Sequence, residues 1–195
     1  MTDRSAEPFT QALSAVAAFL AALPSPGMVI GGMAVIAHGH VRTTEDIDAT
    51  VAGEDVSLER LIELAATHEI RPRLPDAVAF ARRTQVLLLT HIPTGVHLDL
   101  SLAWLPFERD ALRRGLTVVL GNVPVRVCSP EDLVIYKLVA ARPADEDDVR
   151  QMVLRHRTRI DRARVARLMS EFDAALDDGR SRVDLWSRLS HIEDK

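Results

Sequence analysis

Hydrophobic and polar residues follow two different spacings up to about residue 128. Residues 57–69 place Leu58, Leu61 and Ala65 on one side, a spacing that predicts an amphipathic helix. Residues 45–51 instead alternate Ile47 and Ala49 with acidic residues, which predicts a half-buried strand. By the same criteria we expect helices at residues 8–23, 33–38 and 106–114, and strands at residues 28–30, 78–80, 85–92, 96–103, 117–120 and 123–127.

Two short sequences predict how some of these strands are joined. Pro93-Thr94-Gly95 separates residues 85–92 from 96–103, and Gly121-Asn122 separates residues 117–120 from 123–127. Glycine and asparagine tolerate the positive φ angles that tight hairpin turns require. We therefore expect a tight connection in the first case and a β-hairpin in the second.

From Ser129 onward the pattern is helical. Ser129 suits an N-cap, Pro130 suits the first helical position, and the acids that follow are favourable near a helix N-terminus. We expect helices at residues 130–141, 145–155, 162–176 and 182–192. The fold class is therefore α/β (α+β): a core at residues 1–128 with a mixed sheet flanked by helices, followed by a helical unit at residues 129–195 that packs on the core.

Composition and charge limit the partners and the cellular compartment that we expect for this protein. The 195 residues carry a formal net charge of −4, so the whole chain has no general attraction to polyanions. Aromatic residues make up only 4%, which argues against base stacking as the main mode of nucleic-acid binding. The single cysteine, Cys128, excludes an internal disulfide, and the apolar residues 12–23 are too few to cross a bilayer. We expect a cytoplasmic protein without a membrane partner.

Positive charge is nevertheless concentrated in residues 150–167. Arginine occupies positions 150, 155, 157, 159, 162, 164 and 167, and Asp161 is the only acid of the segment. A solvated helix face is one interpretation. The other is a surface for the phosphates of RNA, such as a tRNA acceptor.

Asp46 and Asp48 form the most informative pair of the chain. Side chains two residues apart in a strand point to the same face, where two carboxylates repel each other and are costly to bury. Mg²⁺ resolves this conflict, because it prefers oxygen ligands and keeps positions open for substrate phosphates. Asp99, in the apolar run 97–101, is expected as the third metal ligand and a candidate general base. A salt bridge to an arginine is its alternative.

Gly31 and Gly32 lie where a predicted strand passes into a predicted helix. Because glycine has no side chain, the backbone N–H groups of this turn can approach phosphate oxygens. A tight turn without a ligand is the alternative. The glycine pair gains weight from the Asp46-Ile47-Asp48 sequence that follows it.

These two motifs together resemble the signature of the nucleotidyltransferase superfamily related to DNA polymerase beta. The segment is most similar to small bacterial proteins that include AbiEii-type toxins, in which a Gly-Gly-x-Ala opening leads through an arginine and a threonine to Asp-Ile-Asp. Arg42 and Thr44 match that pattern. The resemblance implies a nucleotidyltransferase fold, a third acid at Asp99, and nucleotide binding by the glycine pair, Arg42 and Thr44.

A later helical motif of the same family is weaker. Its lysine, arginine and Asp-x-x-Asp fall on Lys137, Arg142, Asp145 and Asp148, and the resemblance implies that they bind the nucleotide. From the residues alone, Lys137 could instead extend to solvent beside the core. Arg142, Asp145 and Asp148 could equally form a structural cluster of ion pairs.

The implied activity is magnesium-dependent transfer of a nucleoside monophosphate from an NTP to an acceptor hydroxyl of RNA, protein or a small molecule. Asp46, Asp48 and Asp99 would be the catalytic and metal-binding residues. The resemblance also implies a toxin of a toxin–antitoxin system, with an antitoxin protein as partner. The alternative is a non-catalytic nucleotide-binding or partner-binding module, because Met33 stands where many relatives carry Ser or Thr.

Overall fold

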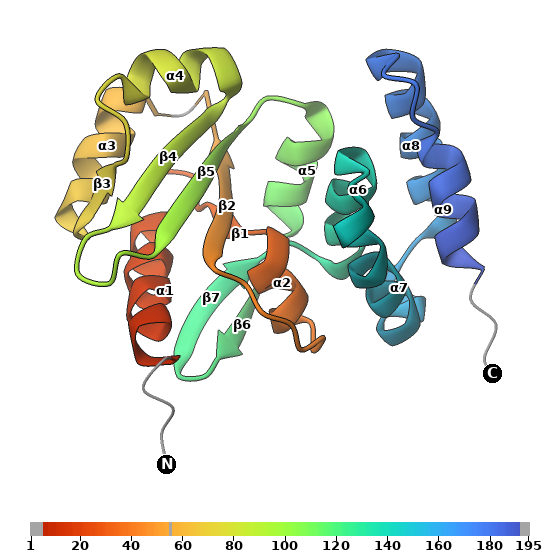
Figure 1. Ribbon diagram of the computed structural model, residues 1–195, viewed down its shortest axis with the longest axis horizontal. Helices are drawn as coiled ribbons and strands as arrows, with labels where there is room; N and C mark the ends of the chain where they lie inside the picture. The colour runs from red at the N-terminus through yellow and green to blue at the C-terminus, as the bar shows by residue number, and fades with distance from the viewer. Residues whose placement is uncertain (1–5, 55, 192–195) are drawn as a thin grey trace. The chain divides into compact units, whose positions relative to one another are not determined.

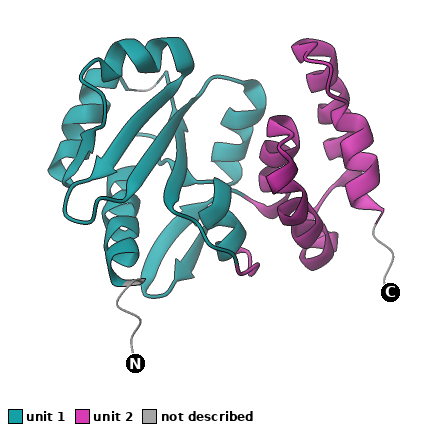
Figure 2. Cartoon of the chain, in the orientation of Figure 1, with its two compact units in different colours: residues 1–37, 42–128 teal, residues 38–41, 129–195 magenta. Residues whose placement is uncertain are grey.

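The structure is a computed structural model that describes residues 6–54 and 56–191. The chain divides into two compact units, shown in two colours in Figure 2. Unit 1 comprises residues 1–37 and 42–128, and unit 2 comprises residues 38–41 and 129–195.

Unit 1 contains a seven-stranded mixed sheet with strand order β3-β4-β5-β2-β1-β7-β6 (Figure 1). Its strands are β1 (Met28–Val29), β2 (Asp46–Ala52), β3 (Ile70–Pro72), β4 (Val86–His91), β5 (His97–Ala103), β6 (Leu116–Leu120) and β7 (Val123–Val127). Its helices are α1 (Ala6–Ala21), α2 (Gly31–Ala37), α3 (Leu58–Thr67), α4 (Ala77–Thr84) and α5 (Pro106–Arg114). The β1–β7 and β2–β5 pairs are parallel and the other neighbours are antiparallel, which confirms the predicted mixed α/β class.

The central strands β2 and β5 have one buried face and one partly open face. In β2, Ile47, Ala49 and Val51 are buried and contribute to the core. In β5, Leu98, Leu100 and Leu102 do the same. The residues that alternate with them at the start of each strand are more exposed, so polar side chains can lie there without being buried.

Helix α1 begins and ends close to the expected positions and packs on β7. Its residues Ala12, Val16 and Phe19 are buried, so the apolar stretch near the N-terminus belongs to the core of unit 1. None of the described helices is both long enough and apolar enough to cross a bilayer. Both connections are confirmed as hairpins, with Gly95 (φ 73°) and Gly121 (φ 61°) at positive φ.

One prediction for local structure is wrong, one strand was not predicted, and one expected helix begins two residues early. Residues 78–80, expected as a strand, lie within α4, because Ala77 and Ala81 are buried one helical turn apart and the run is too short to show a period. The strand β3 is not predicted, since it has three residues and includes Pro72, which suits an edge strand. Helix α2 begins at Gly31, so the glycine pair forms its first turn.

The secondary-structure elements in the described residues of unit 2 are all helical. It contains α6 (Pro130–Ala140), α7 (Glu146–Arg155), α8 (Arg162–Leu176) and α9 (Arg182–Ser190), with short 3-10 turns η1 (Pro143–Asp145) and η2 (Arg157–Arg159). The predicted N-cap is confirmed, because the Ser129 hydroxyl accepts a hydrogen bond from the Asp132 N–H at 3.1 Å.

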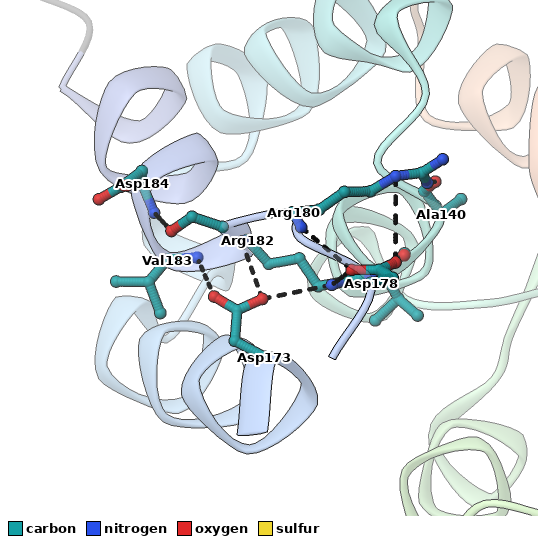
Figure 3. A network of polar contacts seen from close by, with 9 residues as sticks. Ala140, Asp173, Asp178, Arg180, Arg182, Val183 and Asp184 are labelled. Carbon is teal, nitrogen blue, oxygen red and sulfur yellow. Dashed lines mark hydrogen bonds and ion pairs between the residues drawn. The ribbon is translucent and has the colours of Figure 1, made fainter. Parts of the chain in front are cut away.

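A buried arginine connects three helices of unit 2 (Figure 3). The side chain of Arg182, at the start of α9, is 2% exposed. It donates hydrogen bonds to Asp173 of α8 (3.3 Å), to Asp178 in the following turn (2.7 Å) and to the Val139 carbonyl of α6 (3.1 Å). These contacts compensate the desolvated guanidinium and fix the α8–α9 turn.

Candidate functional site

The acidic residues of β2 and β5 meet at the starts of these two parallel strands. Asp48 lies directly opposite Asp99, and Asp46 lies opposite His97. Adjacent strands are about 4.8 Å apart, so register partners present their side chains side by side on the same face. The Asp46 carboxylate lies 3.5 Å from Nδ1 of His97. The predicted same-face arrangement of Asp46 and Asp48 therefore extends to Asp99 on the neighbouring strand.

Asp99 also has an arginine partner that the sequence pattern does not indicate. The guanidinium of Arg73 donates from Nη2 to Asp99 Oδ1. Arg73 follows β3, and its backbone N–H donates to the Leu88 carbonyl of β4 at 3.0 Å, so the β-sheet holds it near Asp99. The salt bridge considered as an alternative for Asp99 is thus present. Only the order β3-β4-β5 brings these residues together, across 26 positions of sequence.

Gly31 packs directly against the Asp48 carboxylate. Its φ angle is 60°, in the left-handed region that favours glycine, and a Cβ atom at this position would overlap the Asp48 side chain. The Ile30 N–H donates to the Asp48 carbonyl at 2.9 Å, and this hydrogen bond holds the turn between β1 and α2 against β2. Two independent constraints therefore require glycine at position 31: its own positive φ angle and the close approach of the Asp48 carboxylate.

Gly32 is the contact point for two more of the predicted nucleotide-binding residues. A Cβ atom on Gly32 would lie 2.8 Å from Thr44 Oγ1 and 3.7 Å from Arg42 Cζ. The Thr44 hydroxyl donates to the Asp46 carbonyl at 3.0 Å, and Arg42 Nε donates to the Thr43 carbonyl at 3.1 Å. The structure thus gathers the glycine turn, Arg42 and Thr44 around the start of β2. This group combines backbone N–H groups, a hydroxyl and an exposed guanidinium beside carboxylates.

The carboxylates of β2 and β5 are ligands of the type that Mg²⁺ prefers. Within residues 6–54 and 56–191, no three His, Cys, Asp or Glu side chains converge closely enough to form a ready-made metal cage. Mg²⁺ does not need one, because it is usually bound by one or two carboxylates together with water and substrate phosphates. Asp48 and Asp99 lie side by side, and the Asp99 side chain is 38% exposed. The residues present therefore fit a magnesium ion that arrives with a nucleotide.

The second predicted motif forms its own cluster in unit 2. Lys137 is buried, with its Nζ 2.6 Å from Asp145 Oδ1 and 2.7 Å from Asp148 Oδ2, and Arg142 Nε lies 2.6 Å from Asp145 Oδ2. Burial alone raises the pKa of Asp145, but hydrogen bonds from Lys137 and Arg142 outweigh it and hold that pKa below its usual value. The Lys137 side chain is buried and does not extend to solvent. The contacts are those of a cluster of ion pairs.

Several arginines of residues 150–167 already have partners within unit 2. Arg164 pairs with Glu131 and Asp132, Arg150 pairs with Glu146, and Arg167 pairs with Glu171. Arg162 donates to the Ser190 carbonyl at 2.9 Å. These contacts neutralise part of the segment's charge, and the arginines extend over α7, η2 and α8 instead of one helix face.

Comparison with known proteins finds solved structures with a similar fold. A solution structure of the antibiotic-resistance factor ANT(2'')-Ia has a TM-score of 0.59 and 20% identity, covering 90% of this chain and 95% of that chain. Its crystal structure with adenylyl-2''-tobramycin gives 0.56 and 20%, covering 87% and 98%. JHP933 from Helicobacter pylori gives 0.55 and 14%, covering 97% and 90%. No curated protein matches the chain.

These similarities show that the chain has a nucleotidyltransferase-like fold. The family model "Nucleotidyl transferase AbiEii toxin, Type IV TA system" matches residues 18–178. The chain therefore belongs to the AbiEii nucleotidyltransferase toxin family. The match includes the glycine turn, the three aspartates and the Lys137 cluster.

Proposed function

We propose that this protein transfers a nucleoside monophosphate from an NTP to an acceptor hydroxyl, with Mg²⁺ bound at Asp46, Asp48 and Asp99. The observation that supports this most strongly is the register of Asp48 opposite Asp99, with Gly31 packed against the Asp48 carboxylate. Family membership supports nucleotidyl transfer in general. The metal, the nucleotide and the acceptor are our proposals.

The reaction joins the acceptor oxygen to the α-phosphorus and breaks the bond to the bridging oxygen, so that pyrophosphate leaves. Bound Mg²⁺ would supply charge neutralisation and polarisation of the phosphate oxygens. Arg42 and the N–H groups of Gly31 and Gly32 would orient the triphosphate. Oδ1 of Asp99 is paired with Arg73. Oδ2 would therefore contact the metal through one lone pair and accept the proton of the acceptor hydroxyl through the other.

The acceptor hydroxyl belongs, in this proposal, to an RNA such as tRNA, a protein or a small molecule. The arginines of residues 150–167 support an RNA acceptor only in part, because four of them already contact groups in unit 2. The crystal structure of ANT(2'')-Ia is a complex with adenylyl-2''-tobramycin, an adenylylated small molecule, which supports a small hydroxylated acceptor. Membership in a toxin family supports an antitoxin protein as partner.

A non-catalytic nucleotide-binding module is the second candidate. Met33, in α2, has no hydroxyl to offer a phosphate, and its side chain is buried, with 5% exposed. The Arg73–Asp99 pair also occupies one oxygen of the third carboxylate. This candidate predicts nucleotide binding without transfer of the nucleotide to any acceptor.

Calorimetry with each of the four NTPs, with and without Mg²⁺, tests the site. We expect wild type to bind at least one NTP only when Mg²⁺ is present, and Asp46→Ala and Asp48→Asn to lose that binding. Asp76→Asn is a matched control, because Asp76 is an exposed acid of unit 1 whose side chain forms no cap hydrogen bond. Equal Mg²⁺-dependent binding by wild type and Asp48→Asn would show that the site is assigned wrongly.

A further inference from the structure

Unit 1 contains a pocket that lies away from the acidic residues. It has a volume of about 410 Å³ and is formed by the residues before β1, the end of β2, the C-terminal part of α5 and one residue of β7. Asp46 begins β2 and Ala52, which lines the pocket, ends it. Six residues of strand span about 20 Å, so this pocket is separate from the proposed nucleotide site.

The pocket lining combines apolar surface with guanidinium groups. Pro24, Pro26 and Leu112 supply apolar surface. Three arginines supply positive charge against the single carboxylate of Glu54: Arg109, Arg113 and Arg126. A pocket of this size suits a small organic ligand, and a few fixed polar groups would set its orientation.

The three arginines are not equivalent. Arg109 pairs with Glu54 at 3.0 Å, and Arg113 pairs with Asp110. Arg126 instead donates to two backbone carbonyls, from Nη1 to Pro26 at 3.3 Å and from Nη2 to Leu112 at 2.5 Å. In the described part of the chain, no carboxylate forms an ion pair with Arg126.

Burial without a compensating anion lowers the pKa of the Arg126 guanidinium. The carbonyl of Leu112 lies at the end of α5, so Arg126 has a structural role as a cation at a helix C-terminus. The hydrogen bonds to Leu112 and Pro26 together engage two of its five N–H donors. The Gly115 backbone supports the guanidinium closely, because a Cβ atom there would lie 2.7 Å from Arg126 Cζ.

We propose that this pocket binds a small organic anion, whose phosphate or carboxylate group pairs with Arg126 and whose apolar body contacts Pro24, Pro26 and Leu112. A guanidinium binds either anionic group through two parallel N–H donors, and the interaction is strong when the arginine is already partly desolvated. The ligand supplies an anionic partner for the Arg126 guanidinium. This site does not depend on the proposed nucleotidyl transfer.

The test uses phenyl phosphate and benzoate as separate probes, with benzyl alcohol as the neutral control, at constant ionic strength. Amide chemical shifts of the full chain are followed by NMR. We expect one or both anions to shift the signals of Ala52, Leu112 and Gly115 with saturation, and benzyl alcohol to leave them unchanged. The response to each anion shows whether the pocket prefers a phosphate or a carboxylate.

Variants assign the site to Arg126. Arg126→Gln keeps a hydrogen-bond donor for the helix end and removes the charge, so we expect anion affinity to fall about tenfold or more. Gly115→Ala displaces the guanidinium without removing it, and is expected to weaken binding as well. Arg83→Gln, at an exposed arginine of α4, is the matched control and should bind like wild type.

The proposal fails if neither anion shifts these signals, or if Arg126→Gln and wild type bind with equal affinity. Loss of binding in Arg42→Gln would also overturn it, because the anion would then lie beside Gly32. If Arg126→Gln does not fold, the anion affinity of Gly115→Ala is compared with that of wild type. Equal affinities would contradict the proposal.

Discussion

Gly31→Ala tests the local geometry of the site, and its effect can be worked out from two contributions. The φ angle of 60° makes any L side chain unfavourable there, which costs about 1–2 kcal/mol. The added methyl group overlaps the Asp48 carboxylate, and relief of such an overlap costs about 1–3 kcal/mol. We expect a total loss of about 2–5 kcal/mol in the free energy of unfolding, together with loss of Mg²⁺-dependent NTP binding.

Gly95→Ala separates these contributions. Gly95 has a φ angle of 73°, and a Cβ atom there would meet nothing within 4 Å. This variant should lose only the backbone part, about 1–2 kcal/mol, and should bind NTP like wild type. Urea unfolding gives the stabilities, and calorimetry gives the binding. Equal destabilisation by the two variants, or normal NTP binding by Gly31→Ala, would refute the contact between Gly31 and Asp48 as the basis of the site.

Three further predictions concern charges. Arg73→Gln frees Asp99 from a competing cation, so titration calorimetry with Mg²⁺ and NTP should show affinity about threefold to tenfold higher than wild type. Lys137→Met removes the buried cation that Asp145 and Asp148 share, although Asp145 keeps Arg142, and urea unfolding at neutral pH should show a loss of about 3–5 kcal/mol. The Arg182 hydrogen bond lowers the pKa of Asp178 to about 2, so this pair stabilises the fold above the usual carboxyl pKa of 3.8 and ceases to do so as pH falls toward 2. Unfolding measured across that range should depend less on pH in Asp178→Asn than in wild type.

Local pattern alone predicted much of the fold. Alternation at period two placed Asp46 and Asp48 on one face of a strand, and the structure has that strand. The hairpin glycines and the Ser129 cap act through residues only a few positions away, so their sequences sufficed to locate them. Residues 78–80 look like a strand in the sequence, because three apolar residues are too few to show a helical period. The burial of Ala77 and Ala81, one helical turn apart, is what favours the helix.

The contacts that determine the chemistry of the site could not be read from the sequence in the same way. Arg73 reaches Asp99 only because a three-residue edge strand pairs with β4, which in turn pairs with β5. The sequence supplied an arginine as an alternative partner for Asp99 but could not say which one. Similarly, whether Lys137 would extend to solvent depended on how α6 and α7 pack, and the packing placed it between two aspartates.

A labelling experiment tests most directly whether the three aspartates support nucleotidyl transfer. Wild type is incubated with Mg²⁺, total RNA, cell lysate and each NTP labelled on the α-phosphate, beside Asp48→Asn and the Asp76→Asn control. We predict that label from at least one NTP enters an acceptor with wild type and Asp76→Asn and does not with Asp48→Asn. Absence of label from every acceptor with all four NTPs would contradict nucleotidyl transfer and favour a binding module, and equal labelling by Asp48→Asn would contradict the assignment of the site.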